Sequence, residues 1–144
     1  MPSVLIADDR EENRYVLVNF FKLFGSSANI KIMEAGTAKE TIEIVINEKP
    51  DLVFMDIRME TNDAGLNAVK IIRENPIIAD TQIWAITAQT SDMEETENYK
   101  EKCLKAGFND YITKPFDLIE LLVKVSEYLK VSIPENTRKK IGLK

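Results

Sequence analysis

The chain of 144 residues contains no histidine and a single cysteine, Cys103. The absence of histidine removes the commonest general base and metal ligand. A lone cysteine excludes an internal disulfide and fits a reducing cytoplasm. No apolar run approaches the roughly 18 residues of a membrane span, and the start of the chain lacks the basic and long apolar regions of a signal peptide.

The chain has no excess of basic charge, because 24 acidic residues outnumber 19 basic ones and give a formal net charge of −5. This balance argues against nonspecific nucleic-acid binding by the whole surface. The last 15 residues are an exception: residues 130–144 carry a net charge of +4, whereas residues 1–129 carry −9. We expect one domain over residues 1–130 and a basic, flexible tail over residues 131–144. The alternative is a docking arm for an acidic partner surface.

Short apolar runs alternate with longer amphipathic stretches along the chain. The expected strands are Val4–Ala7, Ile30–Ala35, Leu52–Met55, Ile83–Ile86 and the weak Tyr111–Ile112. Between the expected strands, apolar residues recur at the spacing of one helix face, as in Leu17, Phe20, Phe21 and Phe24. Capping spacings at Thr37 with Glu40, Ser91 with Glu94 and Asp117 with Glu120 mark helix starts, and Gly107 marks an end. The order (βα)5 predicts an α/β fold with a parallel sheet covered by helices on both faces.

Polar side chains follow the expected strands at the edge where parallel sheets bind ligands. Asp8 and Asp9 follow the first strand, Asp56 the third, Thr87 the fourth and Lys114 the fifth. Three neighbouring carboxylates require either a proton or a cation among them. Oxygen ligands of this kind suit Mg²⁺. An aspartate beside such an ion, a lysine and a hydroxyl can act as a nucleophile toward a phosphoryl group.

The chain resembles the receiver domains of the two-component response-regulator superfamily, including those attached to hybrid kinases. The motifs are "IADD" (6–9), "DLVFMDIRM" (51–59), "AITA" (85–88) and "KAGFNDYITKPF" (105–116), within a resemblance that spans about residues 3 to 130. The resemblance implies a flavodoxin-like, doubly wound sheet with strand order 2-1-3-4-5. It also implies a phosphorylation-controlled signalling switch and not a metabolic enzyme.

The resemblance gives each motif residue a role. Asp56 matches the phosphoacceptor, and Lys114 matches the lysine that contacts the phosphate. Asp8 and Asp9 match the acidic pair that binds Mg²⁺, with Asp56 and the backbone carbonyl of Arg58 as further ligands. Thr87 and Tyr111 match the switch hydroxyl and the switch aromatic, and the Lys114–Pro115 bond is expected to be cis.

The implied partners are a sensor histidine kinase or a histidine phosphotransfer protein. Output is expected through protein contacts, with another protein or a second copy of the chain, on the face formed by helix 4, strand 5 and helix 5. The basic tail has no helix-turn-helix pattern, so no nucleic-acid contact is expected. Met1 directly before the first strand favours a separate regulator over a piece of a hybrid kinase.

Two departures from the family pattern stand out. Glu60 occupies the position of the usual proline and Gly65 comes about one residue late, which predicts a freer and more acidic loop after Asp56. The stretch between Thr87 and Lys114 is longer than usual, which predicts an altered output face.

Three other functions remain alternatives. A receiver-shaped adaptor would never be phosphorylated. An Mg²⁺-dependent phosphohydrolase would want an acid where Arg58 stands. A flavin-binding module would want Gly, Ser or Thr after the first strand, where this chain has "DDREEN".

Overall fold

The computed structural model of the chain describes residues 1–61, 63–88 and 96–143. Five parallel strands form one sheet in the order β2-β1-β3-β4-β5, as the resemblance to receiver domains implied. The strands are β1 (Ser3–Ala7), β2 (Lys31–Ala35), β3 (Leu52–Met55), β4 (Ile83–Ala88) and β5 (Asp110–Lys114). They coincide with the expected runs to within about two residues. The central strands β1, β3 and β4 are apolar stretches that helices cover on both sides, whereas β2 and β5 at the sheet edges are only partly buried.

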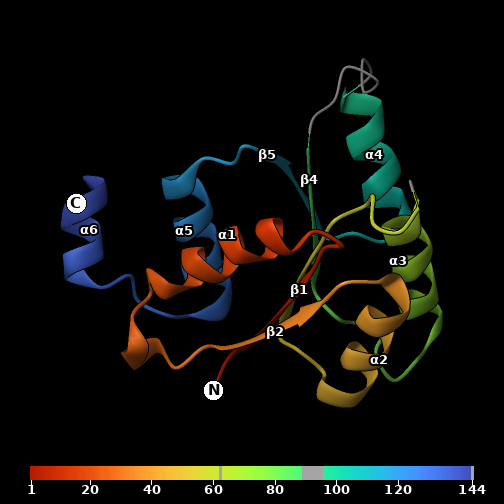
Figure 1. Ribbon diagram of the computed structural model, residues 1–144, viewed down its shortest axis with the longest axis horizontal. Helices are drawn as coiled ribbons and strands as arrows, with labels where there is room; N and C mark the ends of the chain where they lie inside the picture. The colour runs from red at the N-terminus through yellow and green to blue at the C-terminus, as the bar shows by residue number, and fades with distance from the viewer. Residues whose placement is uncertain (62, 89–95, 144) are drawn as a thin grey trace.

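Helices cover both faces of the sheet (Figure 1). The helices α1 (Glu11–Lys22) and α5 (Leu118–Leu129) lie on one face, and α2 (Ala38–Glu48), α3 (Ala64–Glu74) and α4 (Thr96–Ala106) lie on the other. A short 3-10 turn, η1 (Ser26–Ala28), leads from α1 into β2. This doubly wound arrangement is the flavodoxin-like fold.

The two faces enclose separate apolar cores. The α1 stripe of Leu17, Phe20, Phe21 and Phe24 is buried with apolar residues of β1, β3, β4 and α5. The opposite core combines residues of α2, α3 and α4 with the other sides of the same strands. Side chains of the apolar strands point alternately into the two cores. This packing fixes the sheet and therefore the positions of the polar residues that follow the strands.

Local signals in the sequence account for several helix ends. Thr37 and Asp117 are the N-cap residues of α2 and α5, and each side chain accepts a hydrogen bond from the backbone N–H of the glutamate three residues later. Gly107 follows α4 with a φ of 124°, a conformation that favours glycine. The predicted cap formed by Ser91 and Glu94 lies outside the described residues.

The C-terminal segment, which the sequence predicted to be a flexible tail, contains a helix. Residues of this segment form helix α6 (Glu135–Ile141), which lies near the C-terminal end of α1 (Figure 1). Ile133 and Thr137 are buried there, and the Thr137 hydroxyl donates a hydrogen bond of 2.7 Å to the Leu23 carbonyl. Apolar residues between the basic ones give this segment a packed side that net charge alone did not indicate.

We expect Thr137→Val to lower the free energy of unfolding by about 1–2 kcal/mol, because the part-buried Leu23 carbonyl would lose its donor. Lys140→Ala, on the exposed side of the same helix, should change it by less than about 0.5 kcal/mol. Urea unfolding measures both variants. Equal stability of Thr137→Val and the parent chain would show that α6 does not hold this contact in solution.

Candidate functional site

The two buried aspartates of the site follow adjacent central strands. Ala7 of β1 pairs with Met55 of β3, so Asp8 and Asp56 leave the sheet side by side. The Asp8 N–H donates to the Ala35 carbonyl at 3.0 Å, and the Asp56 N–H donates to the Ala7 carbonyl at 2.9 Å. The sheet ladder therefore continues through the first atoms of both residues and fixes where their carboxylates begin.

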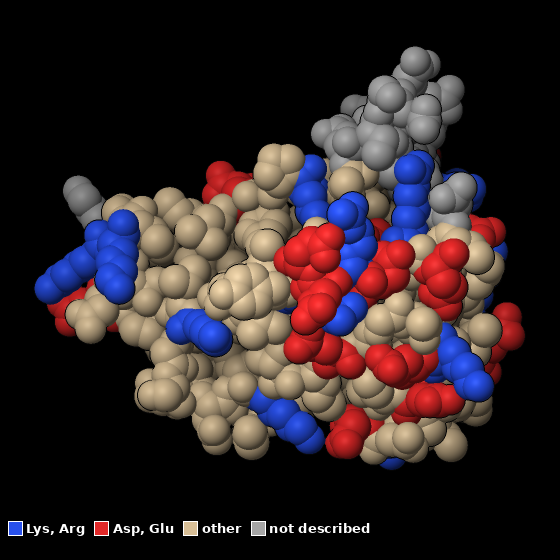
Figure 2. Space-filling model, viewed as in Figure 1, with Lys and Arg blue, Asp and Glu red and all other residues tan. Residues whose placement is uncertain are grey.

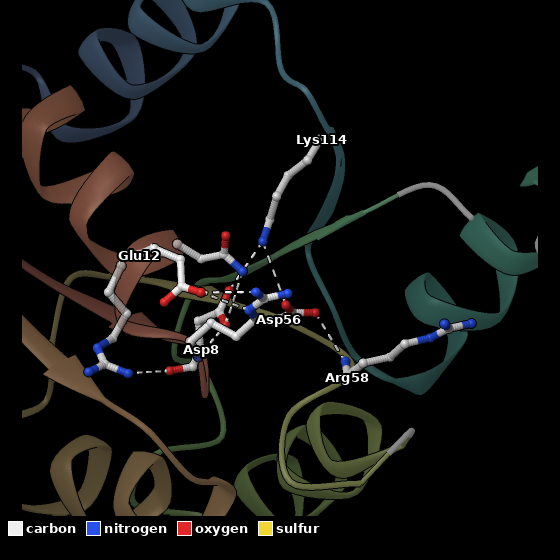
Figure 3. Close-up of polar contacts among 8 residues, drawn as sticks. Asp8, Glu12, Asp56, Arg58 and Lys114 are labelled. Carbon is white, nitrogen blue, oxygen red and sulfur yellow. Dashed lines mark hydrogen bonds and ion pairs between the residues drawn. The ribbon is translucent and has the colours of Figure 1, made fainter.

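Lys114 brings a single ammonium group to both carboxylates (Figure 3). Its Nζ lies 3.1 Å from Asp8 Oδ2 and 3.6 Å from Asp56 Oδ2. Asp8 is 2% exposed and Asp56 is 8% exposed, so water screens the cluster poorly. One positive charge thus faces two buried negative charges.

This imbalance changes the acidity of Asp56. The pKa of Asp56 is raised to about 6, chiefly by burial; Lys114 opposes this rise and the nearby Asp8 carboxylate adds to it. The Arg58 N–H donates a hydrogen bond of 3.1 Å to Asp56 Oδ1, and this bond orients the carboxylate. Without a metal, Asp56 therefore holds its proton more tightly than an ordinary aspartate. A bound cation would offset the negative charge of the carboxylates and favour the ionised form of Asp56.

The first turn of α1 supports Asp8 from the other side. The Arg10 N–H donates to Asp8 Oδ1 at 2.9 Å, and Asn13 Nδ2 lies 3.5 Å from the same oxygen. Arg14 donates to the Asp8 backbone carbonyl at 2.7 Å and pairs with Glu34 at 3.1 Å. The sequence analysis did not find Asn13 and Arg14, although their place one turn after the acidic pair is a signal for such contacts.

The donor atoms present are those that Mg²⁺ prefers. Asp8 and Asp56 supply carboxylate oxygens, and Asp9 lies beside Asp8, where burial and the Asp8 charge raise the pKa of Asp9. Within the described ranges, no three acidic side chains converge as a ready-made metal cluster. Mg²⁺ commonly binds through one or two carboxylates and keeps several waters, so the residues present fit this ion.

The residues predicted to act as a switch, Thr87 and Tyr111, lie on the neighbouring strands β4 and β5. Thr87 is buried on β4 in register with Thr113 of β5, and no hydrogen bond within the described part of the chain joins it to Asp56. Tyr111 on β5 is also buried. The Lys114–Pro115 bond is cis, as expected from the resemblance.

The comparisons with known proteins agree with this geometry. The model of the response regulator receiver domain matches residues 4–126. The chain belongs to the response regulator receiver family. Its sequence is 36% identical over 126 residues to the hybrid signal transduction histidine kinase K of Dictyostelium discoideum, covering 83% of this receiver and 10% of that protein.

Two solved structures extend the likeness. One is a co-crystal structure of the Saccharomyces cerevisiae histidine phosphotransfer protein Ypd1 with the receiver domain of Ssk1 (28% identity, TM-score 0.68, 94% and 95% of the chains covered). The other, the receiver domain of sensor histidine kinase PA1611 from Pseudomonas aeruginosa with magnesium in its active-site cleft, is 22% identical and shows the fold alone (TM-score 0.69, 90% and 98% covered). The chain spans about a tenth of one of these curated relatives and about half of another, the transcriptional regulatory protein YvrH of Bacillus subtilis, which is 32% identical over 89% of this chain.

Two described residues after Asp56, in a stretch for which the sequence predicted a freer loop, make backbone contacts that the sequence did not indicate. The Glu60 carboxylate accepts hydrogen bonds from the Ala38 N–H at 3.0 and 3.1 Å, and the Gly65 N–H donates to the Ile57 carbonyl at 2.8 Å. The lengthened stretch after Thr87 falls largely on residues 89–95, outside the described part of the receiver. No described helix is long and apolar enough to span a membrane.

Proposed function

We propose that this receiver domain is a signalling switch that accepts a phosphoryl group on Asp56. The observation that carries the proposal is the pair of buried carboxylates at the strand ends with Lys114 between them. An Asp56 oxygen forms the new bond to phosphorus while the nitrogen–phosphorus bond of a phosphohistidine breaks, and the imidazole keeps the electron pair. The donor histidine lies outside this chain, which has none.

Each neighbour of Asp56 has a distinct task in this step. The Arg58 N–H holds one carboxylate oxygen, and Lys114 neutralises charge at the other and is placed to contact the incoming phosphoryl oxygens. Asp8, Asp9, Asp56 and the Arg58 carbonyl would hold Mg²⁺, which lowers the negative charge that a phosphoryl donor meets. Slow loss of the phosphoryl group to water would reset the switch.

An apolar groove beside Lys114 supports docking of a phosphodonor protein. The groove has a volume of about 260 Å³ and is lined by Val16, Leu17, Ile86, Pro115 and Phe116 among others. Tyr15 and Val16 on α1 are 66% and 53% exposed, so large apolar side chains reach solvent next to the site. A histidine kinase or phosphotransfer protein that presents its phosphohistidine from an apolar surface fits this groove.

We propose that output passes through α4, β5 and α5. After phosphorylation the Thr87 hydroxyl bonds a phosphoryl oxygen, and Tyr111 moves with it. A cavity of about 300 Å³ lined by residues of β5 and α5, including Tyr111 and Lys124, leaves room for such movement. The partner on this face is a protein, or a second copy of the receiver.

The test treats the parent chain and Asp56→Asn with acetyl phosphate and Mg²⁺, followed by intact-mass measurement. We expect one added phosphoryl group on the parent and none on the variant, because the amide cannot form the acyl phosphate. Omission of Mg²⁺ should lower the labelled fraction at a fixed time at least about tenfold. Equal labelling of both proteins would contradict Asp56 as acceptor, and labelling of neither would favour an adaptor that is never phosphorylated.

A further inference from the structure

The Glu60 carboxylate, which lies outside the proposed cation site, connects the loop after β3 to helix α2. Glu60 lies on this loop, and both of its carboxylate oxygens accept from the N–H of Ala38, the first residue of α2. The Thr37 side chain accepts from the Glu40 N–H, so the two side chains cap different donors of the same helix end. A carboxylate at this position also interacts favourably with the helix dipole.

The loop that Glu60 tethers carries the proposed carbonyl ligand. Arg58 lies two residues before Glu60, and its own N–H already holds the Asp56 carboxylate. The Arg58 side chain points away from Asp56 (Figure 3), so its contribution at the site comes from the backbone. The path of that backbone therefore decides where the carbonyl stands.

The helix that Glu60 contacts, α2, is connected to the backbone beside Asp8. Helix α2 follows β2, and the last residue of β2, Ala35, accepts the hydrogen bond from the Asp8 N–H. Glu60 thus ties the Arg58 loop to the strand end that positions Asp8. The surface over this part of the molecule is crowded with acidic side chains (Figure 2), and Glu60 differs from a merely exposed acid by its two contacts to Ala38.

We infer that Glu60 is a positioning residue for the cation-binding loop, an inference that rests on the proposed function. Its carboxylate holds the loop against α2, and the Arg58 carbonyl on this loop would bind the same ion as the Asp56 carboxylate. A proline at this position would restrict the loop through its backbone. Here a side-chain contact to a neighbouring helix does so.

The test compares Glu60→Ala with Glu60→Gln, which lose the same charge. Glutamine keeps an oxygen that can accept from the Ala38 N–H, whereas alanine does not. We expect Glu60→Ala to bind Mg²⁺ about fivefold more weakly than Glu60→Gln, the size of one net hydrogen bond. Isothermal titration calorimetry with MgCl₂ gives the Kd values, and the amide hydrogen exchange of Ala38 reports the tether without any metal.

The outcomes separate the tether from the charge and from the proposed function. Faster exchange at Ala38 in Glu60→Ala alone, together with its weaker Mg²⁺ binding, would support the positioning role. Equal Kd values for the two variants, with the parent binding Mg²⁺, would overturn the role and leave the proposed function intact. If no protein binds Mg²⁺ at millimolar concentration, the proposed cation site fails, and the role of Glu60 fails with it.

Discussion

Replacement of Gly65 by alanine should lower the free energy of unfolding by about 3 kcal/mol, because no space exists for the added methyl group. A Cβ at this position would lie 2.4 Å from the Asp56 carbonyl oxygen and 2.7 Å from the Ile57 Cα. These are backbone atoms at the end of β3, which a side-chain rotation cannot move. The strand end or the start of α3 must therefore shift.

The shift should reach the site directly. Gly65 donates its N–H to the Ile57 carbonyl at 2.8 Å, and Asp56 and Arg58 flank Ile57. We expect Gly65→Ala to lower the rate of labelling by acetyl phosphate at least about tenfold at temperatures where the variant is folded, because misplacement of reacting groups by about 1 Å can cost a hundredfold.

Gly36→Ala is the matched control, because its Cβ would meet only the Arg14 guanidinium at 3.6 Å, an ordinary contact. Urea unfolding and intact-mass kinetics on both variants check the prediction. A Gly65→Ala protein as stable and as quickly labelled as Gly36→Ala would mean that α3 does not approach the end of β3 as closely as described.

Part of the site could be predicted from the sequence, and part could not. Parallel topology places the residues after each strand at one edge, so Asp8, Asp56 and Lys114 could be brought together from strand ends alone. Their order along the chain and the apolar runs before them sufficed. The distances between them, and the sharing of one ammonium by two carboxylates, depend on side-chain conformations that no periodicity encodes.

Contacts between distant segments were the part that sequence reasoning missed. Glu60 was read as an acid in a freer loop, yet its partner is a backbone N–H 22 residues earlier in the chain. Thr137 was read as part of a loose tail, yet it binds the Leu23 carbonyl, 114 residues away. In both cases the partner is a backbone group at a helix end, and every helix end offers such groups whatever its sequence. A residue pattern therefore cannot say which end is used.

Asp56→Asn should make the metal-free protein more stable at pH 7.5 by about 3 kcal/mol, although it abolishes the proposed chemistry. The native pKa of Asp56 is raised by burial to about 6, whereas an unfolded aspartate titrates near 3.8. Between about pH 4 and pH 6 the native chain holds a proton that the unfolded chain has lost, so stability falls as pH rises through this window. An asparagine has no such titration, and each unit of difference corresponds to about 1.4 kcal/mol.

Urea unfolding in EDTA from pH 4 to pH 8 measures this difference. The two proteins should be nearly equal in stability at pH 4, diverge up to about pH 6 and run parallel above it. Added Mg²⁺ should stabilise the parent by RT ln(1 + [Mg²⁺]/Kd) and the variant much less, which narrows the gap at pH 7.5. Glu11→Gln removes an exposed carboxylate at the start of α1, and this control should change the stability by no more than about 1 kcal/mol. If Asp56→Asn were less stable than the parent at pH 7.5 without metal, Lys114 would more than neutralise the buried pair, and the native pKa of Asp56 would lie below that of the unfolded chain.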